Sequence, residues 1–289
     1  MKADLVLDCR NEHGEGVLWN ALDRRLWWTD VHGKKLWSYD PTIRTSQSYP
    51  APGRICCFAP RRDGTVVAAF ADGFAFFDPK SGRRDDIATF EPDLPQTRLN
   101  DGRTDRQGNF IAGGMDERDS RPVSSVWLLD GDLKLTKLFG SVRCANSTCF
   151  SPDGRTMYFA DSPDCEIVAF AYTPGSGVVS GKRTVAKLPK ERGVPDGSCV
   201  DAEGFIWNAV WEGYRIERFA PDGRLDRTIE VSVAKPTCVA FGGPELDTLF
   251  ITTSRLASSS EILEREPHSG GLFGVRPGVK GLIDAPFAG

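Results

Sequence analysis

Three short polar segments of this chain each carry one oxygen-bearing side chain among turn-forming residues. They are Glu15 between two glycines, Asn146 in front of a Ser-Thr pair, and Asp196 between a proline and a glycine. Two carboxylates and one amide suit a hard divalent cation such as Ca²⁺, Mg²⁺ or Mn²⁺. With only three protein donors, positions stay open for water or for a substrate whose ester carbonyl the metal polarises. Each segment is also typical of an ordinary solvated turn, so spacing alone does not predict a metal site.

A fourth polar segment carries Arg98 and Asn100, which are two residues apart. On an extended strand this spacing points both side chains the same way, and together they could hydrogen-bond the hydroxyls or the carbonyl of a polar ligand. The local pattern fits equally well with Arg98 in a surface ion pair and Asn100 in an Asx turn.

Other catalytic chemistries find little support in the sequence. The three histidines, His13, His32 and His268, are too few and too far apart for a histidine-based zinc or hydrolytic centre, and we expect His13 to be a turn residue. No G-x-S-x-G elbow is present, and the glycines stand mostly in Asp-Gly turns rather than in a phosphate-binding loop.

The elements that must position these residues follow a repeat. A short β-rich run, a polar turn, a second short run and an Asp-Pro or Asp-Gly turn recur six times, and the first runs begin at positions 26, 65, 109, 156, 205 and 248. The separations, about 39 to 49 residues, match the length of a four-stranded propeller blade. We therefore predict that residues 1–289 form one all-β domain, a six-bladed β-propeller with the four polar segments, including the candidate oxygen ligands of a metal site, at one end of the central channel. A β-sandwich is the alternative.

Two terminal features complete the predicted ring. The run Leu5-Val6-Leu7 is expected to add a strand to the last blade and so close the propeller. The segment 255–266 is expected to form a turn or two of helix as an insertion in that blade.

Composition restricts the partners. The formal net charge is −4 and no basic run stands out, which argues against nucleic acid. No apolar run is long enough for a membrane-spanning helix, and the first residues do not read as a signal peptide. The eight cysteines show no CxxC pair and are expected to be reduced thiols. We expect a cytoplasmic protein that is a monomer or a weak homo-oligomer and does not bind membranes.

Taken in order, the four polar segments and the repeat resemble the regucalcin and gluconolactonase family of sugar lactonases. The resemblance runs through nearly the whole chain. The stretches that carry it best are Gly14-Glu15-Gly16, Leu26-Trp27-Trp28-Thr29-Asp30, Arg98-Leu99-Asn100-Asp101-Gly102, Ser151-Pro152-Asp153-Gly154, Pro195-Asp196-Gly197 and Phe241-Gly242-Gly243-Pro244.

The resemblance implies a role for each candidate residue. Glu15, Asn146 and Asp196 match the family's ligands for one divalent metal ion, with Ca²⁺, Zn²⁺, Mn²⁺ and Fe²⁺ all compatible. Asp196 also matches the general base, while Arg98 and Asn100 match positions that contact substrate. An acidic substrate contact is expected after Met115; we assign it to Glu117, with Asp116 as the alternative.

The implied activity is metal-dependent hydrolysis of an aldono-1,4- or 1,5-lactone, a sugar lactone, to the aldonic acid in carbohydrate catabolism. Two alternatives stay open: a calcium-binding regulatory protein without significant catalysis, and a broader esterase or phosphotriesterase of the paraoxonase-like kind. One departure bears on the site, because Ser147 stands where the family often has glycine, and a different turn is expected there.

Overall fold

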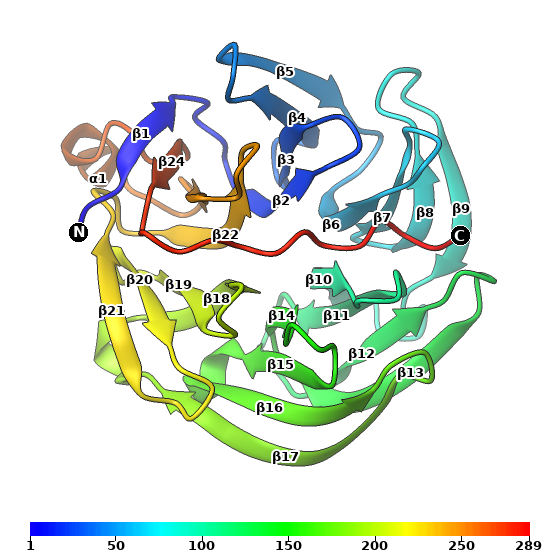
Figure 1. Ribbon diagram of the computed structural model, residues 1–289. Coiled ribbons are helices and arrows are strands. Elements are labelled where there is room, and N and C mark those ends of the chain that lie inside the picture. Colours follow the sequence, from blue (N-terminus) through cyan, green and yellow to red (C-terminus); the bar gives the residue numbers. More distant parts are fainter.

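The computed structural model describes residues 1–289 and consists almost entirely of strands. The strands form six four-stranded sheets, every one with antiparallel pairing, arranged as blades around a central channel (Figure 1). The predicted six-bladed β-propeller is confirmed.

Blades one to five each use four consecutive strands, numbered here from the channel outward. Blade one contains β2 (Gly14–Asn20), β3 (Arg25–Asp30), β4 (Lys35–Asp40) and β5 (Thr45–Pro50); blade two contains β6 (Ile55–Pro60), β7 (Val66–Phe70), β8 (Gly73–Phe77) and β9 (Arg84–Thr89); blade three contains β10 (Thr97–Thr104), β11 (Phe110–Asp116), β12 (Ser124–Leu129) and β13 (Leu135–Val142). Blade four contains β14 (Ala145–Phe150), β15 (Thr156–Asp161), β16 (Glu166–Thr173) and β17 (Val178–Lys187), and blade five contains β18 (Val194–Val200), β19 (Ile206–Trp211), β20 (Arg215–Phe219) and β21 (Leu225–Glu230).

Blade six joins the two ends of the chain. Its inner strands are β22 (Pro236–Gly242), β23 (Thr248–Thr253) and β24 (Leu272–Val275), and its outermost strand is β1 (Asp4–Leu7), which pairs with β24. The predicted closing strand is therefore confirmed. The short helix α1 (Ser260–Arg265) lies between β23 and β24, as expected for the insertion, and two 3₁₀ turns occur at Ser162–Asp164 and Lys190–Arg192.

The sequence repeat corresponds to the two middle strands of each blade. These strands carry the apolar side chains that pack between neighbouring blades, for example Trp207 of β19 edge-on to Phe241 of β22, with ring centroids 5.8 Å apart. In blades two to five, an Asp-Gly or Asp-x-x-Gly turn joins the innermost strand to its neighbour, and Gly64, Gly108, Gly154 and Gly204 all have positive φ there, as such tight hairpins require. The pattern thus located the blades correctly.

Every innermost strand carries an irregularity close to its first residues. The antiparallel register shifts between Glu15 and Leu18 in β2, between Leu99 and Gly102 in β10, between Asn146 and Cys149 in β14, and between Pro195 and Ser198 in β18, with equivalent shifts in β6 and β22. A bulge of this kind bends the strand and redirects a side chain. All six occur at the same end of the channel, because the innermost strands run in the same direction.

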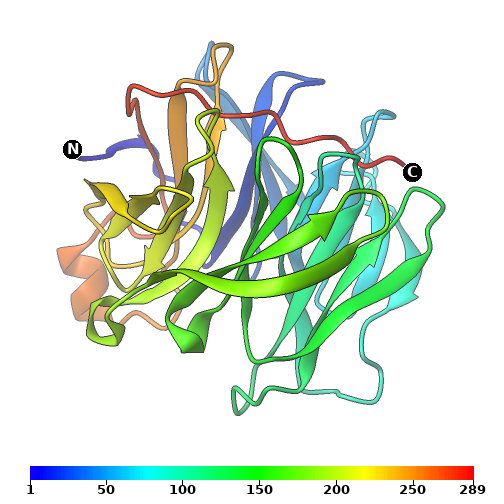
Figure 2. The ribbon, with the colours of Figure 1, turned by 60° about the horizontal axis from the view of Figure 1, so that its bottom comes forward.

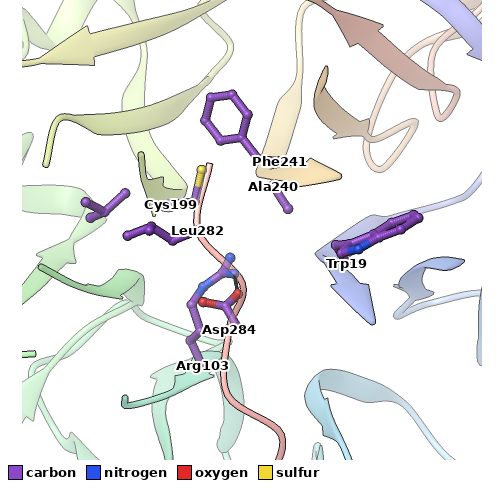
Figure 3. A pocket seen from close by; sticks show the side chains of 8 residues that line it. Trp19, Arg103, Cys199, Ala240, Phe241, Leu282 and Asp284 are labelled. Carbon is purple, nitrogen blue, oxygen red and sulfur yellow. Dashed lines mark hydrogen bonds and ion pairs between the residues drawn. The ribbon is translucent and has the colours of Figure 1, made fainter. Parts of the chain in front are cut away.

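The opposite end of the channel is crossed by the C-terminal segment, residues 276–289 (Figures 1 and 2). Its backbone is tied to several blades, with the Phe287 N–H donating to Pro60 O over 2.8 Å and the Ala288 N–H to Gly108 O over 3.0 Å. In the channel, Asp284 pairs with the buried Arg103 of β10, and Figure 3 shows the two side chains pointing toward one another. This end is therefore covered.

Two further expectations concern thiols and membranes. All eight cysteines are free, and six of them are buried, as expected for reduced thiols. None of the helices combines the length and the apolar character that crossing a bilayer would require.

Candidate active site

A cavity of about 230 Å³ lies at the end of the channel where the innermost strands begin. It brings together Glu15 from blade one, Arg98 and Asn100 from blade three, Asn146 from blade four and Asp196 from blade five. The remaining lining residues are His13, Met115, Cys144, Ser162, Val194, Trp211 and Leu256. Five of the six residues singled out in the sequence thus line one cavity.

The candidate residues do not lie in turns before the inner strands, as their local sequences suggested. Glu15, Asn100, Asn146 and Asp196 belong to the strands β2, β10, β14 and β18 themselves, at or beside their bulges. Short polar segments rich in glycine read as turns, whereas here the propeller supplies ladder partners for them. The strand position holds each side chain more firmly than a surface turn would.

Glu15 and Asp196 are carboxylates without an ion-pair partner. Burial, followed by the charge of Asp101, raises the pKa of Glu15 to about 8. Burial, followed by the charge of Glu15, raises the pKa of Asp196 well above its ordinary value. Only adjacent backbone N–H groups oppose this by hydrogen bonding, from Gly16 to Glu15 and from Gly197 to Asp196. Two such carboxylates favour a cation between them.

The amide of Asn146 is held with its oxygen available. Its Nδ2 donates to Ser162 Oγ over 2.8 Å, while the Ser162 hydroxyl donates its only proton to Pro195 O over 2.7 Å. Ser162 must therefore accept from Asn146, which fixes the orientation of the amide. Oδ1 then faces Asn100, whose Nδ2 lies 3.3 Å away. With Glu15 and Asp196 this makes an all-oxygen donor set, and the residues present fit a hard divalent ion.

Arg98 is buried, so the surface ion pair considered from the sequence is wrong. Its Nε donates to Glu117 over 2.7 Å, and its Nη1 donates to Asn100 Oδ1 over 2.7 Å and to Leu99 O over 2.8 Å. Nη2 has no acceptor in the protein and is not sealed from solvent. The guanidinium is thus fixed on two of its nitrogens and free on the third. Asn100 is likewise not in an Asx turn, because its Oδ1 accepts from Arg98 Nη1 and not from a backbone N–H, while its Nδ2 donates to Ala145 O over 2.9 Å.

The two acidic residues after Met115 have different surroundings. Asp116 turns away from the cavity and accepts from the backbone N–H groups of the loop that follows it, and from Arg121 Nε over 3.0 Å. Glu117 accepts from Arg98, as described above, and also from Arg54, whose Nη1 and Nη2 donate to its two carboxylate oxygens over 2.8 and 2.9 Å. Burial opposes its ionisation, but Arg54 and Arg98 outweigh burial and lower the pKa of Glu117 to about 2. Glu117 lies behind Arg98 and does not line the cavity, and its contact with substrate stays a prediction.

His13 was expected in a turn and instead lies buried in the cavity wall. Its ring is edge-on to Trp211 and to His32, with centroids 5.7 Å away in both cases, and its Nδ1 lies 2.9 Å from Ser254 Oγ. Burial first, then the charges of Arg98, His32 and Lys235, lowers the pKa of His13 to about 3. The sequence offered one signal for it, since His13 stands two residues before Glu15.

Ser147 adopts the left-handed conformation, with φ of 59°, directly after Asn146. Gly16 has φ of 58° directly after Glu15, so the two bulges share one geometry. The expectation that serine would change this turn is not borne out by its backbone. Its buried hydroxyl donates to Asp196 O over 2.6 Å and contacts Ser198 Oγ and Asn208 Nδ2. This network joins blades four and five beneath the cavity.

Comparisons with known proteins agree with the fold. An L-arabinolactonase of Azospirillum brasilense is 40% identical, covering 100% of this chain and 96% of the relative. Regucalcin of Xenopus laevis is 31% identical, covering 100% and 99%. The crystal structure of a calcium-binding protein, regucalcin, from Agrobacterium tumefaciens superposes with a TM-score of 0.93 at 28% identity, over 100% of this chain and 97% of the other.

The family profile gives the same answer over most of the chain. The profile of the SMP-30/Gluconolactonase/LRE-like region matches residues 13–255, a range that begins two residues before Glu15 and includes every candidate residue. The chain therefore belongs to the SMP-30/gluconolactonase/LRE-like family.

Proposed function

We propose that this protein hydrolyses a sugar lactone, an aldono-1,4- or 1,5-lactone, to its aldonic acid, and that it uses one divalent metal ion to do so. The observation that carries the proposal is the meeting of Glu15, Asn146 and Asp196 with Arg98 and Asn100 in one cavity. The lactonase activity named for the arabinolactonase relative supports it.

Glu15, Asn146 and Asp196 would hold the metal, with Ca²⁺, Zn²⁺, Mn²⁺ and Fe²⁺ as the candidate ions. When bound, such an ion supplies positive charge that polarises a lactone carbonyl. Asp196 takes the proton of the attacking water at a carboxylate oxygen, since it lines the cavity and no cationic side chain of the protein pairs with it. The water oxygen bonds to the carbonyl carbon, the bond from that carbon to the ring oxygen breaks, and the ring oxygen takes the proton back from Asp196, which gives the open-chain hydroxy acid.

Arg98 and Asn100 orient the lactone. The free Nη2 of Arg98 donates to an oxygen of the substrate, and the fixed Nε and Nη1 prevent the guanidinium from swinging away. Asn100 connects this clamp to Asn146, because its Nδ2 lies 3.3 Å from Asn146 Oδ1. Holding the lactone in a fixed orientation relative to the attacking water lowers the entropic part of the activation free energy.

The test is proton release from a panel of aldonolactones before and after chelation, followed by add-back of each candidate ion. We expect hydrolysis that the chelator abolishes and at least one ion restores. Asp196→Asn should lower kcat by a factor of roughly a hundred or more, since it removes the base and replaces a charged ligand with a neutral amide. Chelator-insensitive hydrolysis would contradict the metal, and no hydrolysis of any aldonolactone would contradict the function.

A calcium-binding role without catalysis accounts for less of the cavity. Binding Ca²⁺ requires the oxygen donors but gives no reason for a buried arginine with one free nitrogen beside them. Arg98→Lys separates the two roles, because a metal-binding protein would keep its Ca²⁺ affinity while a lactonase would lose kcat/KM.

A further inference from the structure

His13 presents one ring nitrogen to the protein and the other to the cavity. Nδ1 lies 2.9 Å from Ser254 Oγ, whereas Nε2 has no partner in the protein. Nε2 is not sealed from solvent either, although the residue is only 8% exposed. His13 lines the cavity, and we infer that its unpartnered Nε2 is the atom exposed there.

The hydrogen bonds around Ser254 decide which nitrogen carries the proton. Ser254 Oγ lies 3.0 Å from Glu12 O and accepts from the Leu256 N–H over 3.0 Å. Ser254 Oγ is the donor to Glu12 O, and the serine hydroxyl has only one proton to give. That proton is therefore committed to Glu12 O, so Ser254 Oγ must accept from His13, whose Nδ1 carries the hydrogen.

A neutral imidazole protonated at Nδ1 has a lone pair at Nε2. Ser254 is the only hydrogen-bond partner of the ring and no carboxylate pairs with it, so nothing in its surroundings favours the imidazolium at neutral pH. On this side of the cavity, the ring thus offers an acceptor, while the free Nη2 of Arg98 offers a donor. A ligand with both a carbonyl and hydroxyl groups can satisfy the two at once.

We propose that His13 is a specificity-determining residue that accepts, through Nε2, a hydrogen bond from one hydroxyl of the lactone. Ser254 is the positioning residue that keeps the proton on Nδ1. This proposal rests on the lactone hydrolysis proposed above. It adds that, among hydroxylated lactones, the enzyme prefers those with a hydroxyl group at the position that His13 contacts.

The first test does not depend on turnover. Long-range ¹H–¹⁵N correlation of the histidine rings, in the full-length chain with Ca²⁺ as a diamagnetic ion, reports which nitrogen is protonated. The chain has only three histidines, so His13→Gln and His32→Gln spectra assign the signals. A protonated Nδ1 with an unprotonated Nε2 is expected. A proton on Nε2 would overturn the proposal.

The second test uses a pentono-1,4-lactone and its three monodeoxy forms. His13→Phe keeps a ring of similar size but has no acceptor, and it should raise KM for the hydroxylated lactone roughly threefold to tenfold, the worth of one neutral hydrogen bond. For the one deoxy form that lacks the recognised hydroxyl, His13→Phe and wild type should have the same KM. Additive losses for every deoxy form would overturn the proposal.

Two further variants separate recognition from folding. His13→Gln retains an acceptor of similar reach and should recover most of the affinity for the hydroxylated lactone. His32→Gln is the matched control, because His32 packs on His13 yet does not line the cavity, and its KM should equal that of wild type. Equal KM values for wild type and both His13 variants would refute the role of His13. If wild type hydrolyses no lactone, the proposed function fails instead, while the proton position is still measured.

Discussion

Replacing Ser147 separates two effects that this residue combines, a strained backbone and a buried hydroxyl. Its φ of 59° costs an L-residue about 1 to 2 kcal/mol relative to glycine. Its hydroxyl donates to Asp196 O and accepts from Ser198 Oγ and Asn208 Nδ2, over 2.6, 3.0 and 3.1 Å. Ser147→Ala removes the hydroxyl and keeps the strain, whereas Ser147→Gly removes both.

The hydrogen bonds that survive set the magnitude. Asp196 O keeps a donor in Asn208 Nδ2 at 3.2 Å, and Asn208 Nδ2 keeps Ser198 Oγ at 2.9 Å, but the Ser198 hydroxyl loses its acceptor. One buried unsatisfied donor costs about 1 to 3 kcal/mol, so Ser147→Ala should lower the free energy of unfolding by about 2 kcal/mol. Glycine relieves the strain but adds about 0.4 to 1 kcal/mol of unfolded-state entropy, which leaves Ser147→Gly about 1 kcal/mol below wild type.

Urea unfolding of the two variants measures these differences, and Ser141 provides the control. Ser141 has nearly the same backbone, with φ of 61°, but its side chain is exposed and makes no hydrogen bond. There, alanine should leave the free energy of unfolding unchanged and glycine should raise it slightly. The reasoning is refuted if Ser147→Ala is as stable as wild type, or if glycine is worse than alanine at both positions.

Three other perturbations test separate parts of the molecule. Arg98→Lys keeps the charge but loses the fixed planar fork, so kcat/KM should fall roughly tenfold to a hundredfold in lactone hydrolysis assays, and an unchanged value would argue against the clamp. The pKa of Glu117 is depressed to about 2, below its unfolded value, so the ionised Glu117 stabilises the folded protein above about pH 4.3 and this contribution is lost as the pH falls toward 2. The midpoint of thermal unfolding of Glu117→Gln should therefore depend less on pH between these values than that of wild type. Identical pH profiles for the two proteins would contradict this. Phe287→Ala empties a buried site at the covered end of the channel and should cost about 3 kcal/mol in urea unfolding with KM unchanged; equal stability would show that the C-terminal segment does not clamp the ring.

The two middle strands of each blade could be predicted from the sequence, whereas most innermost and outermost strands could not, and burial explains the difference. Middle strands such as β7 (Val66–Phe70) are buried on both faces and read as continuous apolar runs between Asp-Gly turns. Outer strands such as β5 (Thr45–Pro50) are mostly exposed and have no apolar pattern. Innermost strands carry the polar site residues and a bulge, which interrupts the alternation that marks a strand.

The site was predictable only as a set of residue types. Glu15, Asn146 and Asp196 could be named from the sequence as oxygen donors, but their separations in sequence do not predict that they lie close together. They meet because each lies near the start of an innermost strand, and the innermost strands all run in the same direction. The one sequence signal for His13 was its position two residues before Glu15, and a single polar residue before glycine is more typical of a turn. Its burial follows from the closing of the ring, which bridges His13 to Ser254 of blade six.

The charge balance inside the channel bears on the proposed metal. Two buried arginines enter the channel from β10, and each already has an acidic partner outside the donor set, Glu117 for Arg98 and Asp284 for Arg103. Neither arginine forms an ion pair with Glu15 or Asp196, and the pKa values of both carboxyl groups stay raised. A buried carboxylate pair with no protein cation needs either protons or a metal ion to balance its charge. Because a divalent ion balances both carboxylates at neutral pH, the arrangement of the two arginines favours metal binding as strongly as the donors themselves do.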